Sequence, residues 1–270
     1  ASTSAFLGVS FCAIPTASFV LRIKSAQSIT YFRENFSLFL EQKAWYNLVK
    51  SDCEDGNMNC KQWIFDMDGT LTDSMTAVWE NAPLALLRRY GREPKADLRT
   101  TLLSMGMADG AQYLIREYAL PLKPEDYFGV MRSVIAELYE SVELKPGVRE
   151  LLARLKAEGA RMCICSNTWS DQCKAVLTRL GLDDHFEFYV EAQGPLHKSR
   201  PDVFFAALQR LGGTNPHRCA VCEDSLYAAR TAHDAGFYVI GIADAASAAD
   251  EPALRRVSDQ FLTRWAELKF

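Results

Sequence analysis

Two aspartates that follow a short apolar run are the residues whose types and spacing best suit chemistry. Asp66 and Asp68 come directly after Trp63-Ile64-Phe65 and before Gly69. The run predicts a buried parallel strand, and its carboxyl end would deliver both carboxylates into a crevice, with Gly69 bending the chain so that their roles diverge. Two such close anions repel, so the pair is stable mainly with a cation or a shared proton. A lone Asp-x-Asp-Gly would more often be a turn that caps the next helix.

Three further polar clusters follow downstream. Ser166-Asn167 comes after the apolar run 161–165, Lys198 lies in a loop, and Glu223-Asp224 comes after the run 219–222. Each is a weak signal alone, because such residues are usually helix caps or solvated surface charges. We expect them to meet the two aspartates, because parallel strands bring their carboxyl ends to one edge of a sheet.

The elements that must position these clusters alternate between strand and helix. After the first strand, apolar runs predict strands at 161–165, 186–190, 219–222 and 237–242. Helical patterns lie between them, at 146–159, 171–180, 203–211 and 225–235. This alternation predicts an α/β protein with a doubly wound, Rossmann-like parallel sheet. Between Ser74 and Lys145 the pattern is helical instead, at 76–90, 97–103, 108–119 and 124–142, and Pro83 should kink the first of these helices or displace its start.

In this order the four clusters resemble the four motifs of the haloacid dehalogenase-like hydrolases, over roughly residues 62–243. The resemblance implies a core domain of residues 58–75 and 144–270 with a small α-helical cap domain inserted at 76–143. The sequence departs from the family pattern at two positions, and these departures concern the shape of loops and not the reacting groups. Ser199 stands where the family often has Pro, and Ala228 stands where it often has Gly.

The resemblance also implies roles for the site residues. Asp66 would be the nucleophile that forms an aspartyl-phosphate, and Asp68 would be the general acid and base. Ser166 and the backbone amide of Asn167 would hold phosphate oxygens, and Lys198 would neutralise charge on both Asp66 and the phosphoryl group.

The same resemblance implies Mg²⁺ as the cofactor, because hard oxygen ligands suit this ion. Its ligands would be the Asp66 side chain, the Asp68 backbone carbonyl and Asp224, with Glu223 close by, either as a ligand or supporting one.

The function that follows is a Mg²⁺-dependent phosphatase of a small phosphorylated metabolite. A β-phosphoglucomutase-like phosphosugar mutase is the alternative, since it shares every core residue named above. Thr70 favours hydrolysis, because the mutases more often carry an aliphatic residue there. A non-catalytic binding protein is less well supported, because no motif residue is lost.

The loop 104–107 is a candidate for contact with the substrate. Arg88, Arg89 and Arg99 could meet a substrate anion, although such arginines are more often solvated.

Composition and cysteine usage exclude several other classes. The net charge of −4 gives no electrostatic case for nucleic acid, which would need a clustered basic face. No apolar run is long enough for a membrane span.

The cysteines lie in predicted strands. Cys163 and Cys165 lie in one predicted strand, and Cys219 and Cys222 in another. They indicate core thiols of a reducing compartment, so we expect a cytoplasmic protein. A redox or zinc half-site at Cys219 and Cys222 is the weaker interpretation.

Residues 1–57 are predicted to be an N-terminal extension of open role. Phe32, Phe36, Phe39 and Leu48 recur with charges between them, which is typical of amphipathic helices. Such apolar surface favours docking on the core or self-association, so we expect a monomer or weak dimer. All four motifs lie downstream, and the extension should therefore be dispensable for catalysis.

Overall fold

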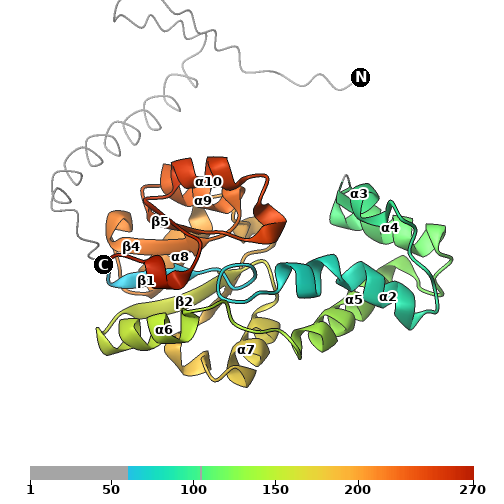
Figure 1. Cartoon of the computed structure of the whole chain (residues 1–270), viewed down its shortest axis with the longest axis horizontal. Helices are drawn as coiled ribbons and strands as arrows, with labels where there is room; N and C mark the ends of the chain where they lie inside the picture. The colour runs from blue at the N-terminus through green and yellow to red at the C-terminus, as the bar shows by residue number, and fades with distance from the viewer. Residues whose placement is uncertain (1–59, 104) are drawn as a thin grey trace, which may run out of the picture. The chain divides into compact units, whose positions relative to one another are not determined.

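A parallel sheet lies at the centre of the protein. The computed structural model describes residues 60–103 and 105–270. Within them six strands are arranged in the order β3-β2-β1-β4-β5-β6, with every neighbouring pair parallel (Figure 1). The strands are β1 Gln62–Phe65, β2 Arg161–Ser166, β3 Tyr189–Glu191, β4 Cys219–Glu223, β5 Tyr238–Ile242 and β6 Gln260–Leu262. The chain leaves β1 toward β2 on one side and later returns to β4 on the other. This arrangement confirms the predicted doubly wound α/β fold.

Both faces of the sheet are buried because side chains alternate along each strand. Trp63 and Phe65 of β1 belong to one core cluster, together with the apolar faces of α6 (Val148–Ala157) and α7 (Ser170–Arg179). Ile64 belongs to a second cluster, which includes residues of α8 (Asp202–Arg210), α9 (Leu226–Asp234) and α10 (Glu251–Val257). These two layers make β1 rigid, and its carboxyl end is therefore a well-fixed platform.

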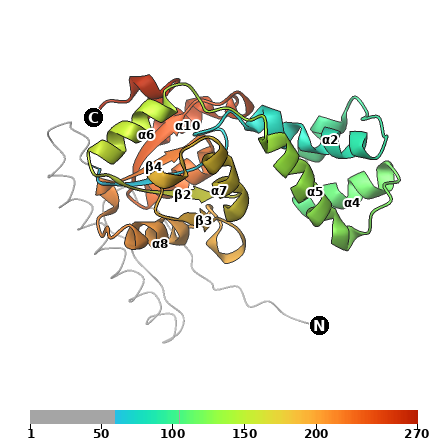
Figure 2. The same cartoon turned by 90° about the horizontal axis from the view of Figure 1, so that it is seen from below.

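A set of helices separates β1 from β2 in the sequence, and we call it the helical insertion. It consists of a π-helix Met75–Glu80, α2 Ala82–Arg89, α3 Leu98–Leu103, α4 Met107–Glu117 and α5 Pro124–Tyr139. Both views show α2, α4 and α5 grouped apart from the strands (Figures 1 and 2). Pro83 lies in the first turn of α2, which confirms that it displaces a helix start, since its missing N–H has no partner to lose there.

The chain enters and leaves the helical insertion through two adjacent segments. Thr72 and Leu144 form an antiparallel bridge, and the amide of Lys145 donates to the carbonyl of Leu71 at 2.9 Å. The segment that follows α5 and the loop after β1 are therefore joined by backbone hydrogen bonds close to the two aspartates.

Some boundaries differ from the sequence-based expectation. Strand β3 begins at Tyr189 rather than Phe186, and α6 begins at Val148, after Gly147 with a φ of 88°, so Pro146 precedes the helix instead of opening it. The α10 helix and the three-residue β6 were not predicted, because short elements carry little periodic signal.

The cysteines predicted to be core residues lie as expected. Cys163 and Cys165 are buried in β2, and Cys219 and Cys222 in β4, all as free thiols.

None of the helices in the described ranges combines the length and the apolar character that crossing a bilayer requires. The predictions for residues 1–57 lie outside the described residues.

Candidate active site

The carboxyl ends of the central strands meet at one cavity. Asp66 directly follows β1, Ser166 ends β2 and Glu223 ends β4. All seven site residues that the sequence predicts line this cavity: Asp66, Asp68, Ser166, Asn167, Lys198, Glu223 and Asp224. Residues up to 158 positions apart in the chain, from Asp66 to Asp224, are therefore brought together by the strand order alone.

Lys198 lies buried between two carboxylates. Its Nζ is 2.5 Å from Oδ1 of Asp66 and 2.5 Å from Oε1 of Glu223. Burial acts to lower the pKa of this amine, but the charges of Asp66 and Glu223 outweigh it and hold the pKa well above its usual value. The side chain is thus a fixed ammonium, and a charge buried in this way is stable only because it is paired.

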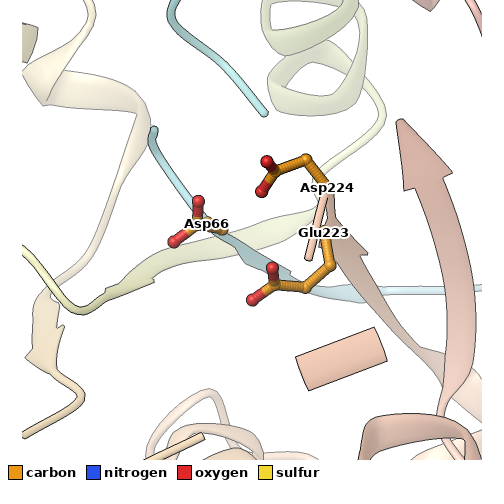
Figure 3. A group of neighbouring side chains, drawn as sticks. All are labelled: Asp66, Glu223 and Asp224. Carbon is orange, nitrogen blue, oxygen red and sulfur yellow. The ribbon is translucent and has the colours of Figure 1, made fainter. Parts of the chain in front are cut away.

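Three carboxylates converge beside this lysine. Asp66, Glu223 and Asp224 each offer an oxygen, and these oxygens lie within 4.8 Å of one another (Figure 3). Burial raises the pKa of Asp66, and it raises the pKa of Glu223 to about 8 and of Asp224 to about 7. Three acids beside a single lysine leave surplus negative charge when ionised. Hard oxygen donors in this arrangement fit a divalent cation of the Mg²⁺ type.

Gly69 permits this close approach. Its φ is 75°, a conformation that L side chains rarely adopt, and a Cβ at this position would lie 2.5 Å from Oδ2 of Asp224. With a larger residue at this position, the Asp224 carboxylate and the Met75 side chain would have to shift.

The side chain of Asp68 is held by three hydroxyl groups. Ser74 Oγ donates to its Oδ1 at 2.6 Å, Tyr139 donates to Oδ1 at 2.7 Å, and Thr168 Oγ1 donates to Oδ2 at 2.6 Å. Burial and the charge of Asp68 raise the pKa of Tyr139, so this phenol stays protonated. A carboxylate oriented in this way can exchange a proton with a group in the cavity.

The loop after β2 is fixed by its own hydrogen bonds. Ser166 Oγ accepts from the amide of Thr168 at 3.1 Å, and Asn167 Nδ2 donates to the hydroxyl of Tyr227 at 2.7 Å. Gln193 Nε2 also donates to the carbonyl of Asn167 at 2.6 Å. These contacts hold Ser166 and Asn167 at the wall of the cavity, beside the start of α7.

Sequence reasoning missed the three partners of Asp68. Ser74 and Thr168 lie within or next to recognised motifs, so proximity to those motifs could have suggested them. Tyr139 is 71 residues from Asp68, and no local pattern distinguishes it from other tyrosines.

The structure places the three candidate arginines of the helical insertion outside the cavity lining. Arg89 bonds to Ser133 and Glu137, and Arg99 pairs with Glu80. In the described chain Arg88, like these two, lies outside the cavity lining. By contrast, Met105, Gly106 and Met107 of the candidate loop do line the cavity, and Ser104 lies outside the described residues.

Comparison with known proteins identifies the family that this fold and site define. The family model for haloacid dehalogenase-like hydrolases matches residues 61–236. The chain therefore belongs to the haloacid dehalogenase-like hydrolases, and the resemblance noted from its motifs is confirmed.

Curated relatives and solved structures agree with this family. The chain is 31% identical to hexitol phosphatase B of Escherichia coli over 60% of its own length and 74% of that protein. It is 26% identical to a probable pseudouridine-5'-phosphatase of Drosophila melanogaster, over 67% and 80% of the two lengths. A putative β-phosphoglucomutase structure from Thermotoga maritima matches with a TM-score of 0.64 and 24% identity, over 75% of this chain and 94% of that one. This last likeness shows the fold.

Proposed function

We propose that this protein is a Mg²⁺-dependent phosphatase that hydrolyses a small phosphorylated metabolite through an aspartyl-phosphate intermediate. The observation that carries the proposal is the buried contact between Asp66 and Lys198 at the cavity wall, beside the carboxylates of Glu223 and Asp224. Phosphoryl transfer depends mainly on positioning and on positive charge near the phosphoryl oxygens. A buried lysine beside a carboxylate nucleophile meets both needs.

The first half of the reaction forms a bond between an Asp66 carboxylate oxygen and phosphorus while the phosphorus–oxygen bond to the alcohol breaks. Protonated Asp68 gives its proton to the leaving oxygen. In the second half, Asp68 takes a proton from water as the water oxygen attacks phosphorus. The bond to Asp66 then breaks, and inorganic phosphate leaves. Throughout, Lys198 balances charge on Asp66, and Ser166 with the Asn167 amide holds phosphoryl oxygens.

The Asp66 and Asp224 side chains and the Asp68 backbone carbonyl would hold Mg²⁺, with Glu223 adjacent. When bound, the ion supplies positive charge that neutralises the phosphoryl oxygens. We further propose that the helical insertion acts as the cap of this site. Residues of α4 and α5 line the same cavity as the carboxylates, which supports this role.

The phosphosugar mutase remains the less supported alternative. The curated relatives named above are phosphatases, and the mutase comparison concerns the fold.

Phosphate release from 4-nitrophenyl phosphate tests the proposal. We expect turnover with Mg²⁺, its loss on addition of EDTA and its return on adding back Mg²⁺. Full activity in EDTA, or none with any divalent cation, would contradict the proposed chemistry.

A further inference from the structure

The cavity extends well beyond the polar strand ends and has a volume of about 410 Å³. Its far walls come from the helical insertion and are apolar, with lining side chains that include Met75, Trp79, Met107, Leu114, Phe128 and Met131. Among the described lining residues, the charged ones are all at the phosphate end: Asp66, Asp68, Lys198, Glu223 and Asp224. The cavity therefore has one polar end and one apolar end.

Three arginines of the insertion are paired with acids. Arg89 and Arg99 pair with acids of the insertion, while Arg132 pairs with Asp171 and lies over the ring of Trp169. A second anionic group on the substrate would find no positive partner at the apolar end. The hydroxyls of a sugar or polyol would lose water there and gain few hydrogen bonds, which is unfavourable.

Part of the apolar lining of the cavity is exposed to solvent. Met107 is 74% exposed, Phe128 41% and Tyr227 41%, and all three line the cavity. Exposed apolar residues that gather at a concave site favour an apolar ligand, because binding removes them from water.

From these observations we infer that the substrates are phosphate monoesters whose alcohol part is apolar, an alkyl or arylalkyl group, and not a polyol or sugar. This inference rests on the proposed phosphatase function and names the substrate class of that site. The hydroxyl of Tyr127 could form a hydrogen bond with one polar atom in the alcohol part of the substrate. Its side chain is buried against the cavity, and its hydroxyl has no hydrogen-bond partner among the described residues.

A matched pair of substrates tests the inference. n-Hexyl phosphate and sorbitol 6-phosphate have the same number of carbons and the same primary ester, and they differ in the hydroxyls of the chain. Each methylene buried is worth about fourfold in affinity. We therefore expect kcat/KM with Mg²⁺ to be at least about tenfold higher for n-hexyl phosphate. Equal rates, or a preference for sorbitol 6-phosphate, would overturn the inference.

Paired variants locate the effect in the cavity. Phe128→Ala should lower kcat/KM for n-hexyl phosphate about five- to tenfold and leave sorbitol 6-phosphate nearly unchanged. Phe205 of α8 is 40% exposed, close to the 41% of Phe128, but it lies outside the cavity lining, so Phe205→Ala is the control and should change neither rate. Equal losses for both substrates in Phe128→Ala would contradict the apolar contact.

A binding measurement separates this inference from the proposed function. Calorimetry on Asp66→Asn with Mg²⁺ reports affinity without turnover. Tighter binding of n-hexyl phosphate than of sorbitol 6-phosphate supports the apolar substrate class even if the wild-type protein hydrolyses neither, a result that would refute the phosphatase alone. Rapid hydrolysis of 4-nitrophenyl phosphate together with tighter binding of sorbitol 6-phosphate would refute the inference alone.

Discussion

The hydroxyl of Tyr139 donates a 2.7 Å hydrogen bond to Oδ1 of Asp68. Tyr139 is the last residue of α5, and Asp68 lies in the loop that follows β1. The proposed acid and base is therefore oriented by the helical insertion as well as by the core. Movement of α5 would displace one of the three hydroxyl groups that hold the Asp68 carboxylate.

Removing this hydroxyl should slow catalysis. A hydrogen bond to a charged group contributes about 1.5–3 kcal/mol, so we expect Tyr139→Phe to lower kcat about ten- to hundredfold with little change in KM. Steady-state kinetics on an alkyl phosphate and a pH–rate profile would measure it, and the profile of Tyr139→Phe should differ from that of the wild-type protein.

Tyr189→Phe is the matched control, because Tyr189 donates to Oδ1 of Asp183 at 2.6 Å through the same kind of bond. Its stability should fall while kcat and the pH profile stay at wild-type values. If both variants lose only stability, Tyr139 does not position Asp68.

Asp66→Asn should abolish turnover while the fold persists. The substitution is nearly isosteric but deletes the nucleophile, and such losses typically reach several orders of magnitude. Circular dichroism should be unchanged, and no acid-stable phosphate should be bound to the protein after quenching. Asp73 lies in the same segment with an exposed side chain, so Asp73→Asn should retain full activity. Activity of Asp66→Asn within tenfold of wild type would contradict its role.

The strand-end geometry of the site could be predicted from the sequence, because it follows from topology. An apolar run such as 63–65 that ends in acids fixes where those acids go once the strands are parallel. The partners of each carboxylate could not be predicted. Tyr139 reaches Asp68 where the chain that follows α5 returns to the loop after β1, at the bridge between Thr72 and Leu144.

The apolar character of the far end of the cavity could not be predicted from the sequence either. Arg89 and Phe128 both lie on insertion helices, and periodicity alone does not say which of them faces the cavity. The structure turns Arg89 toward Glu137 and places Phe128 in the cavity wall. Packing of α2 and α5 against each other decides this, and that packing depends on many weak contacts distributed along both helices.

Removing the carboxyl group of Asp68 should affect substrates according to their leaving groups. An alkoxide needs a proton as it departs, whereas 4-nitrophenolate does not. We therefore expect Asp68→Ala to lower kcat/KM for n-hexyl phosphate at least about hundredfold more than for 4-nitrophenyl phosphate in the first half-reaction. Single-turnover measurements of alcohol release would show it. A loss of the same size for both substrates would mean that Asp68 acts in orientation and not in proton transfer.

Mg²⁺ binding should release protons and strengthen as the pH rises. Burial raises the pKa of Glu223 to about 8 and of Asp224 to about 7, from ordinary values of 4.5 and 3.8. Near neutral pH the metal-free site thus holds protons that a cation must displace. Calorimetry at pH 7 in buffers of different ionisation enthalpy would count the protons released. Binding without proton release would contradict the raised pKa values.

The same raised pKa values decide whether the stability of the folded protein rises or falls with pH. A raised carboxyl pKa means that the folded protein binds protons more tightly than the unfolded chain. The metal-free protein should therefore lose stability as the pH rises from about 4 to about 8, and the loss should be complete above that range. Mg²⁺ compensates the ionised acids, so the increase in Tm on adding Mg²⁺ should be larger at pH 8 than at pH 6. Asp224→Asn, which removes one of the raised acids and a proposed ligand, should flatten this dependence. A Mg²⁺-induced shift in Tm that is equal at both pH values in the wild-type protein would show that these carboxylates are not the ligands.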